Sequence, residues 1–263
     1  MTPKPKQPRR APPDSPPETS GGEPLVFDER TIPPGSFERV DVPAALLPTH
    51  TTLHLPLTIL NGVRPGPRLW LSAAVHGDEL NGVEVIRQVL EHVDPGRLSG
   101  VVRAVPVVNV FGFIQQSRYL PDRRDLNRSF PGSRTGSLAG RIAHLFMQEV
   151  VSRSSHGIDL HPASLERTNS PQTRTNLDDP AARRMALAFG APVALHANLR
   201  DGSLRAAAAK RGIPIVLYEA GAPQRFDDDA IEVGVRGVLA VMHDLGMLPD
   251  DPSPTCPAAS GKG

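Results

Sequence analysis

The chain has 263 residues and a formal net charge of +1, from 29 Lys and Arg against 28 Asp and Glu, which excludes a polybasic nucleic-acid-binding protein. Hydrophobic residues make up 39% of the chain, a content compatible with a packed core of ordinary size. The 29 prolines are unevenly distributed, because eight lie in residues 1–24 and four in residues 249–263. This distribution predicts disordered Pro-rich tails at 1–24 and 249–263 around a single domain at 25–248.

The N-terminus has basic residues but no apolar run behind them, and no apolar segment of membrane-spanning length occurs elsewhere. We therefore expect a cytoplasmic protein with no membrane partner. Cys256 is the single cysteine and lies in the C-terminal tail. The domain thus has no disulfide framework, no cysteine-based zinc site and no thiol nucleophile. The sequence leaves the oligomeric state open, a homo-oligomer included.

From about residue 36 onward, short apolar runs alternate with segments of helical periodicity. In chain order, the pattern predicts a strand at 69–75, a helix at 79–93, a strand at 101–110, a helix at 138–150, a strand at 158–160, a helix starting after Asp178 and Asp179, a strand at 192–196, a helix ending at Gly212, a strand at 213–218 and a helix at 229–245. Pro106 predicts that the second strand is an edge strand or contains a bulge. The alternation favours an α/β fold with a largely parallel sheet covered by helices on both faces.

Ligands of such sheets bind beyond the carboxyl ends of the strands, and the sequence offers four candidate places for such a site. Three directly follow apolar runs, and the fourth is the loop 125–128, which contains Asn127 and Arg128. His76 and Glu79 form an H-x-x-E pair after the run 69–75, and His161 follows the run 158–160. Two histidines and a glutamate, with water in the fourth position, make an open zinc site of the catalytic type. Glu219 follows the run 213–218 and is a carboxylate free to act as a general base.

Each of these residues also has a plainer interpretation. With nine histidines in the chain, an H-x-x-E spacing arises by chance, and His161 alone could be a hydrogen-bonded core histidine. Glu219 alone would more often be a surface charge at the end of a strand. Asp159 fits best as a carboxylate that orients the His161 ring. The basic segment 118–128 is, in its simplest interpretation, a solvated loop.

Four motifs taken together resemble a known family. In chain order they are HGDELNGVEV from His76, DLNRSFPG from Asp125, DLHPASLERTNSPQTR from Asp159 and LYEAG from Leu217. They are similar to the succinylglutamate desuccinylase and aspartoacylase family, relatives of the zinc carboxypeptidases, over roughly residues 50–245. The resemblance implies a zinc carboxypeptidase-like α/β/α sandwich with a mixed, largely parallel sheet. Members of the family commonly carry a C-terminal β-rich domain. We expect this chain to lack most or all of that domain.

The resemblance also implies roles for individual residues. The zinc ligands are His76, Glu79 and His161, and Glu219 activates the water. The pair Asn127 and Arg128 grips a substrate carboxylate, and Arg118 polarises the scissile carbonyl. Further substrate contacts are carried by the R-x-N-x-P-x-x-R stretch through Arg167, Asn169 and Arg174.

These expectations converge on a zinc-dependent hydrolase with one Zn²⁺ per chain. Its substrate would be a small anionic N-acylated amino acid or a related carboxylate-bearing molecule, cleaved at an amide or an ester. Two alternatives stay open at this point: a metallocarboxypeptidase-like peptidase, and a non-catalytic relative that binds zinc or carboxylates. A serine hydrolase is disfavoured because the chain contains no G-x-S-x-G motif.

Overall fold

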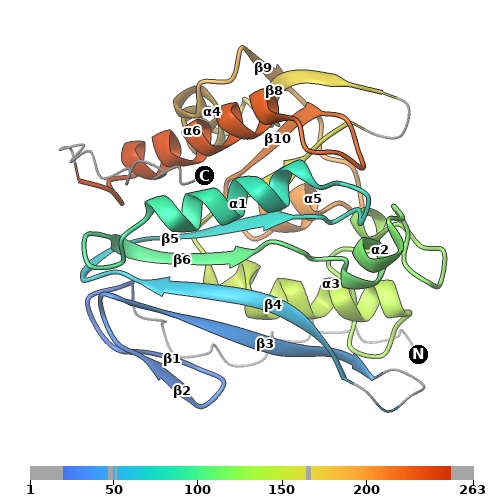
Figure 1. The fold of residues 1–263 in the computed structure, drawn as a ribbon, viewed down its shortest axis with the longest axis horizontal. Coiled ribbons are helices and arrows are strands. Elements are labelled where there is room, and N and C mark those ends of the chain that lie inside the picture. The colour runs from blue at the N-terminus through green and yellow to red at the C-terminus, as the bar shows by residue number, and fades with distance from the viewer. Residues whose placement is uncertain (1–19, 47–49, 51, 164–166, 250–263) are drawn as a thin grey trace, which may run out of the picture.

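The structure is a computed structural model that describes residues 20–46, 50, 52–163 and 167–249. Its centre is an eight-stranded mixed sheet in the order β3-β4-β6-β5-β7-β10-β8-β9 (Figure 1). These strands are β3 (Ser36–Leu46), β4 (Thr52–Asn61), β5 (Arg64–Ala73), β6 (Ser99–Val105), β7 (His156–His161), β8 (Asn169–Thr175), β9 (Val193–His196) and β10 (Ile215–Gly221). A small hairpin of β1 (Leu25–Phe27) and β2 (Arg30–Ile32) lies outside this sheet.

The middle of the sheet is parallel, because β6, β5, β7 and β10 all run in the same direction. The strand β4 pairs antiparallel with β3 and with β6 on one side. On the other side, β8 pairs antiparallel with β10 and parallel with β9. The carboxyl ends of β5, β7 and β10 therefore lie next to one another at one edge of the molecule.

Helices cover both faces of the sheet and enclose two apolar cores. The elements are α1 (Asn81–His92), α2 (Val110–Gln115), the 3₁₀ turn η1 (Leu126–Arg128), α3 (Leu138–Glu149), the 3₁₀ turn η2 (Val151–Arg153), α4 (Pro180–Phe189), α5 (Leu204–Ala209) and α6 (Asp228–Asp244). One core joins α1, α4 and α6 to the sheet, and the other joins α3, α5 and the β1–β2 hairpin to the opposite face. The predicted largely parallel α/β sheet with helices on both faces is confirmed.

The prediction for Pro106 is wrong. β6 ends at Val105, so the proline follows the strand and removes no ladder hydrogen bond from it. β6 lies inside the sheet, paired with β4 on one side and with β5 on the other. Proline here ends an interior strand and does not mark an edge.

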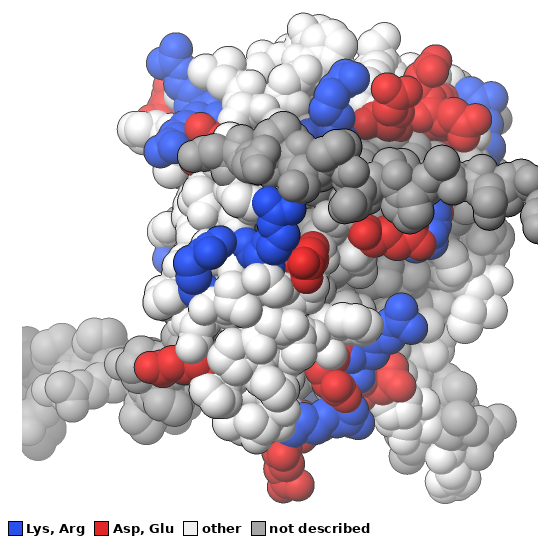
Figure 2. All heavy atoms as spheres, turned by 60° about the vertical axis from the view of Figure 1, so that its left-hand side comes forward, with Lys and Arg blue, Asp and Glu red and all other residues white. Residues whose placement is uncertain are grey.

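The predicted tails fall largely outside the described residues. In the described part, the Gly22 amide donates to the Gly62 carbonyl at 2.8 Å, and the Gly66 amide donates to the Ser20 carbonyl at 2.8 Å. These bonds join residues 20–22 to the sheet. Among the described helices, none combines the length and the apolar character needed to cross a membrane. On the face drawn in Figure 2, Lys and Arg side chains are interspersed with Asp and Glu, so neither sign dominates it.

Candidate active site

The three adjacent parallel strands β5, β7 and β10 carry the predicted metal ligands and base to one place. β5 leads into His76 and Glu79, β7 ends at His161, and Glu219 lies near the end of β10. His161 and Glu219 are register partners in the parallel β7–β10 pair. Because parallel strands present their carboxyl ends at the same edge of a sheet, the topology itself brings these side chains together.

The loop that carries His76 is fixed by close backbone packing. A Cβ atom on Gly77 would lie 1.9 Å from the carbonyl carbon of Gly112 in α2, so only glycine fits there. The Gly77 amide donates to the Ser117 carbonyl at 3.1 Å. The loop with the first ligand is thus docked on the segment that leads into Arg118.

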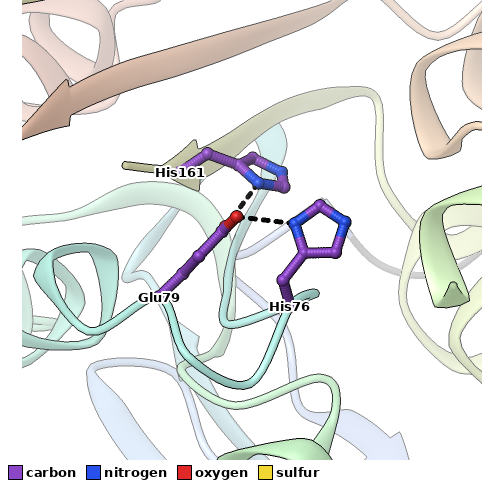
Figure 3. Close-up of side chains that lie close together, drawn as sticks. All are labelled: His76, Glu79 and His161. Atoms are coloured by element: carbon purple, nitrogen blue, oxygen red, sulfur yellow. Dashed lines mark hydrogen bonds and ion pairs between the residues drawn. The ribbon is translucent and has the colours of Figure 1, made fainter. Parts of the chain in front are cut away.

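His76, Glu79 and His161 form a buried cluster whose potential ligand atoms all lie within 4.8 Å of one another. Figure 3 shows the two imidazole rings converging on the Glu79 carboxylate. The Nδ1 atom of His76 lies 2.6 Å from Oε1 of Glu79, and the Nδ1 atom of His161 lies 2.6 Å from Oε2. Two imidazole nitrogens and a carboxylate are the donor set of a divalent metal such as zinc.

The second nitrogen of each ring also faces a carboxylate. Nε2 of His161 lies 2.8 Å from Oδ2 of Asp159, as expected for an orienting carboxylate, and Nε2 of His76 lies 3.2 Å from Oδ1 of Asp125. A neutral imidazole has one N–H and one lone pair, so it cannot donate to two carboxylates at once. The cluster therefore favours a positive charge between the rings and Glu79, carried by protons or by a metal ion.

The pKa shifts reflect this arrangement. Burial acts to lower the pKa of both histidines, but the facing carboxylates outweigh it, so the pKa is raised for His76 and raised well above 6.5 for His161. Burial alone would raise the pKa of Glu79, yet the two imidazoles hold it at about 2. Glu79 is thus ionised across the physiological range, which is the form that binds a cation.

Each orienting carboxylate is itself fixed. The Ser72 hydroxyl donates to Oδ1 of Asp159 at 2.7 Å, and Asp159 is fully buried. Nη2 of Arg118 donates to Oδ2 of Asp125 at 3.0 Å. Partial burial would raise the pKa of Asp125, but His76 and Arg118 hold it below the usual range. Such outer carboxylates fix the ring orientation of metal-binding histidines.

We expect Asp159→Asn to weaken zinc affinity by about 10- to 100-fold, because the amide of the same shape no longer stabilises the N–H at Nε2 as a carboxylate does. Zinc dissociation constants from competition with a chromophoric chelator would measure the change. The control is Asp178→Asn, an exposed aspartate just before α4, which should bind zinc as the unmodified chain does. Equal affinity in Asp159→Asn and the control would refute the role of Asp159.

The proposed base, Glu219, is held from the neighbouring strand β8. Nδ2 of Asn169 donates to Oε2 of Glu219 at 2.9 Å, and Nε of Arg174 forms an ion pair with the same oxygen at 3.3 Å. The Glu219 side chain is 18% exposed, so it is neither sealed in the core nor free on the surface.

Asn127 and Arg128, the residues predicted to bind a substrate carboxylate, lie in the 3₁₀ turn η1, which packs against the segment before α5. The Asn127 Oδ1 atom accepts a hydrogen bond from the Leu204 amide at 3.0 Å, which leaves its Nδ2 group as a donor for a ligand. The Phe130 amide donates to the Gly202 carbonyl at 2.9 Å. Gly202 has a φ of +76°, and a Cβ there would lie 2.6 Å from the Arg128 carbonyl oxygen. The backbone around Arg128 is therefore fixed by tight packing.

All ten residues predicted for the site line one cavity of about 520 Å³. They are His76, Glu79, Arg118, Asn127, Arg128, His161, Arg167, Asn169, Arg174 and Glu219. The motifs did not assign the other lining residues, which include Asn198, Arg200, Ser203 and Arg205. These four follow β9, which runs antiparallel to β5, β7 and β10, so the rule that ligands bind beyond the carboxyl ends of parallel strands gave no signal for them.

Comparison with known proteins agrees with this geometry. Residues 65–245 match the family model of the succinylglutamate desuccinylase/aspartoacylase catalytic domain. The chain belongs to this family. The succinylglutamate desuccinylase/aspartoacylase family consists of deacylases, which are hydrolases.

Individual members of the succinylglutamate desuccinylase/aspartoacylase family resemble the chain over much of its length. N-alpha-acetyl-L-2,4-diaminobutyric acid deacetylase of Halomonas elongata is 28% identical over 212 residues, which cover 75% of this chain and 62% of that protein. The chain thus spans less than two thirds of this curated relative.

Two solved structures share the fold. The succinylglutamate desuccinylase/aspartoacylase from Rhodobacter sphaeroides has a TM-score of 0.75 at 28% identity, covering 82% of this chain and 67% of that one. The product-bound ectoine utilization protein EutE (DoeB) from Ruegeria pomeroyi also has a TM-score of 0.75. It is 23% identical, and the match covers 82% of this chain and 68% of that one.

Proposed function

We propose that this chain is a zinc-dependent hydrolase that cleaves the acyl amide, or an ester in the same position, of a small N-acylated amino acid or a related carboxylate-bearing molecule. The observation that carries the proposal is that the triad of His76, Glu79 and His161 shares one cavity with Glu219. Two histidines and one glutamate that leave a position open are the ligand set of catalytic zinc. A protein that only bound the metal would have no need of the fourth carboxylate.

Zinc held by the triad would act as a Lewis acid on the acyl carbonyl and would lower the pKa of water. Glu219 takes a proton from the attacking water at Oε1, the oxygen without a hydrogen bond to the described residues, and returns it to the leaving amine. The Arg118 guanidinium is held by Asp125 with Nη1 3.8 Å from Oε1 of Glu79. From there it donates to the carbonyl oxygen as that oxygen gains negative charge.

The charge of the cavity supports an anionic substrate. Among the described residues that line it, six are arginines, whereas Glu79 and Glu219 are the two acidic residues. Arg118 and Arg174 are paired with Asp125 and Glu219. Arg128 has no carboxylate of the described residues within ion-pair distance. Its Nη1 donates to the Asn127 carbonyl, and its other N–H groups remain available for a substrate carboxylate, beside the Nδ2 group of Asn127.

The test is a screen of the zinc-loaded protein over N-acetyl, N-succinyl and longer N-acyl amino acids, each assayed also as its C-terminal amide. We expect turnover of at least one free-acid substrate and much weaker turnover of the matching amide, because the amide offers Arg128 no charge. Peptides with a free C-terminus form a separate arm. Turnover confined to these peptides would favour a carboxypeptidase, and no hydrolysis in any arm would refute the proposal.

A further inference from the structure

Three polar side chains of β8 converge on a single oxygen of Glu219. Nδ2 of Asn169 donates to Oε2 at 2.9 Å and Nε2 of Gln172 donates to it at 3.4 Å, whereas Nε of Arg174 forms an ion pair with it at 3.3 Å without a hydrogen bond. In the part of the chain that the structure describes, no donor lies on Oε1. The two oxygens of the carboxylate are therefore in different surroundings, one held by the strand and one left to the cavity.

The register of β8 against β10 explains why its side chains reach Glu219. Gln172 is the direct antiparallel partner of Glu219, and Arg174 is the partner of Leu217, two residues earlier on the same face. Side chains of paired residues project from the same face of a sheet, so Gln172 and Arg174 lie on the Glu219 side.

Asn169 reaches the same face through a bulge. It lies three residues before Gln172, and in a regular strand an odd separation places two side chains on opposite faces. The ladder shifts register between Glu219 and Gly221, so that Gly221 pairs with Asn169 and not with Ser170. β-Bulges of this kind redirect side chains, often next to active sites. The irregularity turns the Asn169 amide toward the base.

We infer that Asn169, Gln172 and Arg174 are positioning residues that hold Oε2 of the base and leave Oε1 to carry the protons. This inference rests on the proposed function, in which Glu219 is the base. It differs from the family resemblance, which predicts that Asn169 and Arg174 contact the substrate. A carboxylate fixed at one oxygen cannot rotate about its last side-chain bond, so its free oxygen stays directed at the cavity.

The two roles predict different kinetics. A positioning residue acts on the chemical step and lowers kcat, whereas a substrate contact used equally before and during reaction raises KM. We expect Asn169→Leu and Arg174→Gln each to lower kcat about 10-fold, with KM changed less than about 3-fold. The assay uses zinc-loaded protein and the fastest-cleaved N-acyl amino acid of the screen. Ser170→Ala, an exposed site on the same strand outside the cavity, is the control and should match the unmodified enzyme.

A double-mutant cycle with Glu219→Gln makes the test independent of small folding defects. If β8 acts through Glu219, Asn169→Leu and Arg174→Gln should change the residual rate of Glu219→Gln by less than about 2-fold, because the group they position is gone. A raised KM at unchanged kcat, or a full 10-fold loss in the Glu219→Gln background, would overturn the inference and leave the proposed function intact. Wild-type turnover in Glu219→Gln would instead overturn the assignment of the base, and this inference with it.

Discussion

Glu219→Gln is expected to bind zinc as the unmodified chain does and to lose turnover by about 10³-fold, within the range that a positioned general base contributes. Glutamine keeps the size of the side chain but cannot accept a proton at neutral pH. The Asn169 and Gln172 amides that donate to Oε2 should hold the glutamine carbonyl on their side, so the NH₂ group would occupy the place of the free oxygen. Steady-state kinetics and zinc content on the same preparation measure both quantities.

The matched control for Glu219→Gln is Glu91→Gln, which removes an exposed carboxylate of α1 outside the cavity. It should keep wild-type turnover. Retained turnover in Glu219→Gln would exclude this residue as the base, and loss of zinc would show that it contributes to the metal site.

His161→Ala should reduce the metal content from about one zinc per chain to less than about one tenth, because two ligands remain of the usual three protein ligands of catalytic zinc. The hydrolytic activity of His161→Ala should fall to background together with the metal content. The substitution also leaves the buried Glu79 carboxylate without one of the two imidazoles that stabilise its charge. Elemental analysis after dialysis against zinc gives the stoichiometry.

His196→Ala is the control for His161→Ala. His196 also ends a short strand, β9, but it is exposed and its Nδ1 accepts a hydrogen bond from the Leu177 amide. This variant should retain its zinc. An unmodified chain that takes up no divalent metal, or His161→Ala with full occupancy, would refute the triad as a metal site.

Strands in the parallel centre of the sheet could be predicted from the sequence, because burial on both faces makes them continuous apolar runs. The runs 69–75, 158–160 and 213–218 correspond to β5, β7 and β10. The pattern missed β3 and β4, whose residues alternate between buried and exposed positions. It also missed β8, Asn169–Thr175, which contains no aliphatic residue. β8 lines the cavity with polar side chains. The strand therefore has no apolar run from which it could be predicted.

The site could be predicted where its residues are local in sequence or directly follow apolar runs, as His76, Glu79 and Glu219 do. The sequence did not indicate contacts that depend on distant segments. Asp125 lies within a motif, but its contact with His76 spans 49 residues. The bond between Asn127 and Leu204 spans 77 residues, and no periodicity encodes it. These residues lie in a loop, at the turn η1 and at the start of α5, so their contacts follow from how these segments pack in the folded chain and not from spacing along it.

The short connection between β7 and β8 places several residues of the site close together in the sequence. β7 ends at His161 and β8 begins at Asn169, and β10 lies between them in the sheet. One stretch, residues 159–174, therefore flanks the base strand on both sides and supplies a ligand, the aspartate that orients it and the donors that hold the base. Exchanging this stretch between relatives would transfer His161, the aspartate that orients it and the side chains that hold the base together, while His76, Glu79 and Glu219 stayed with the recipient.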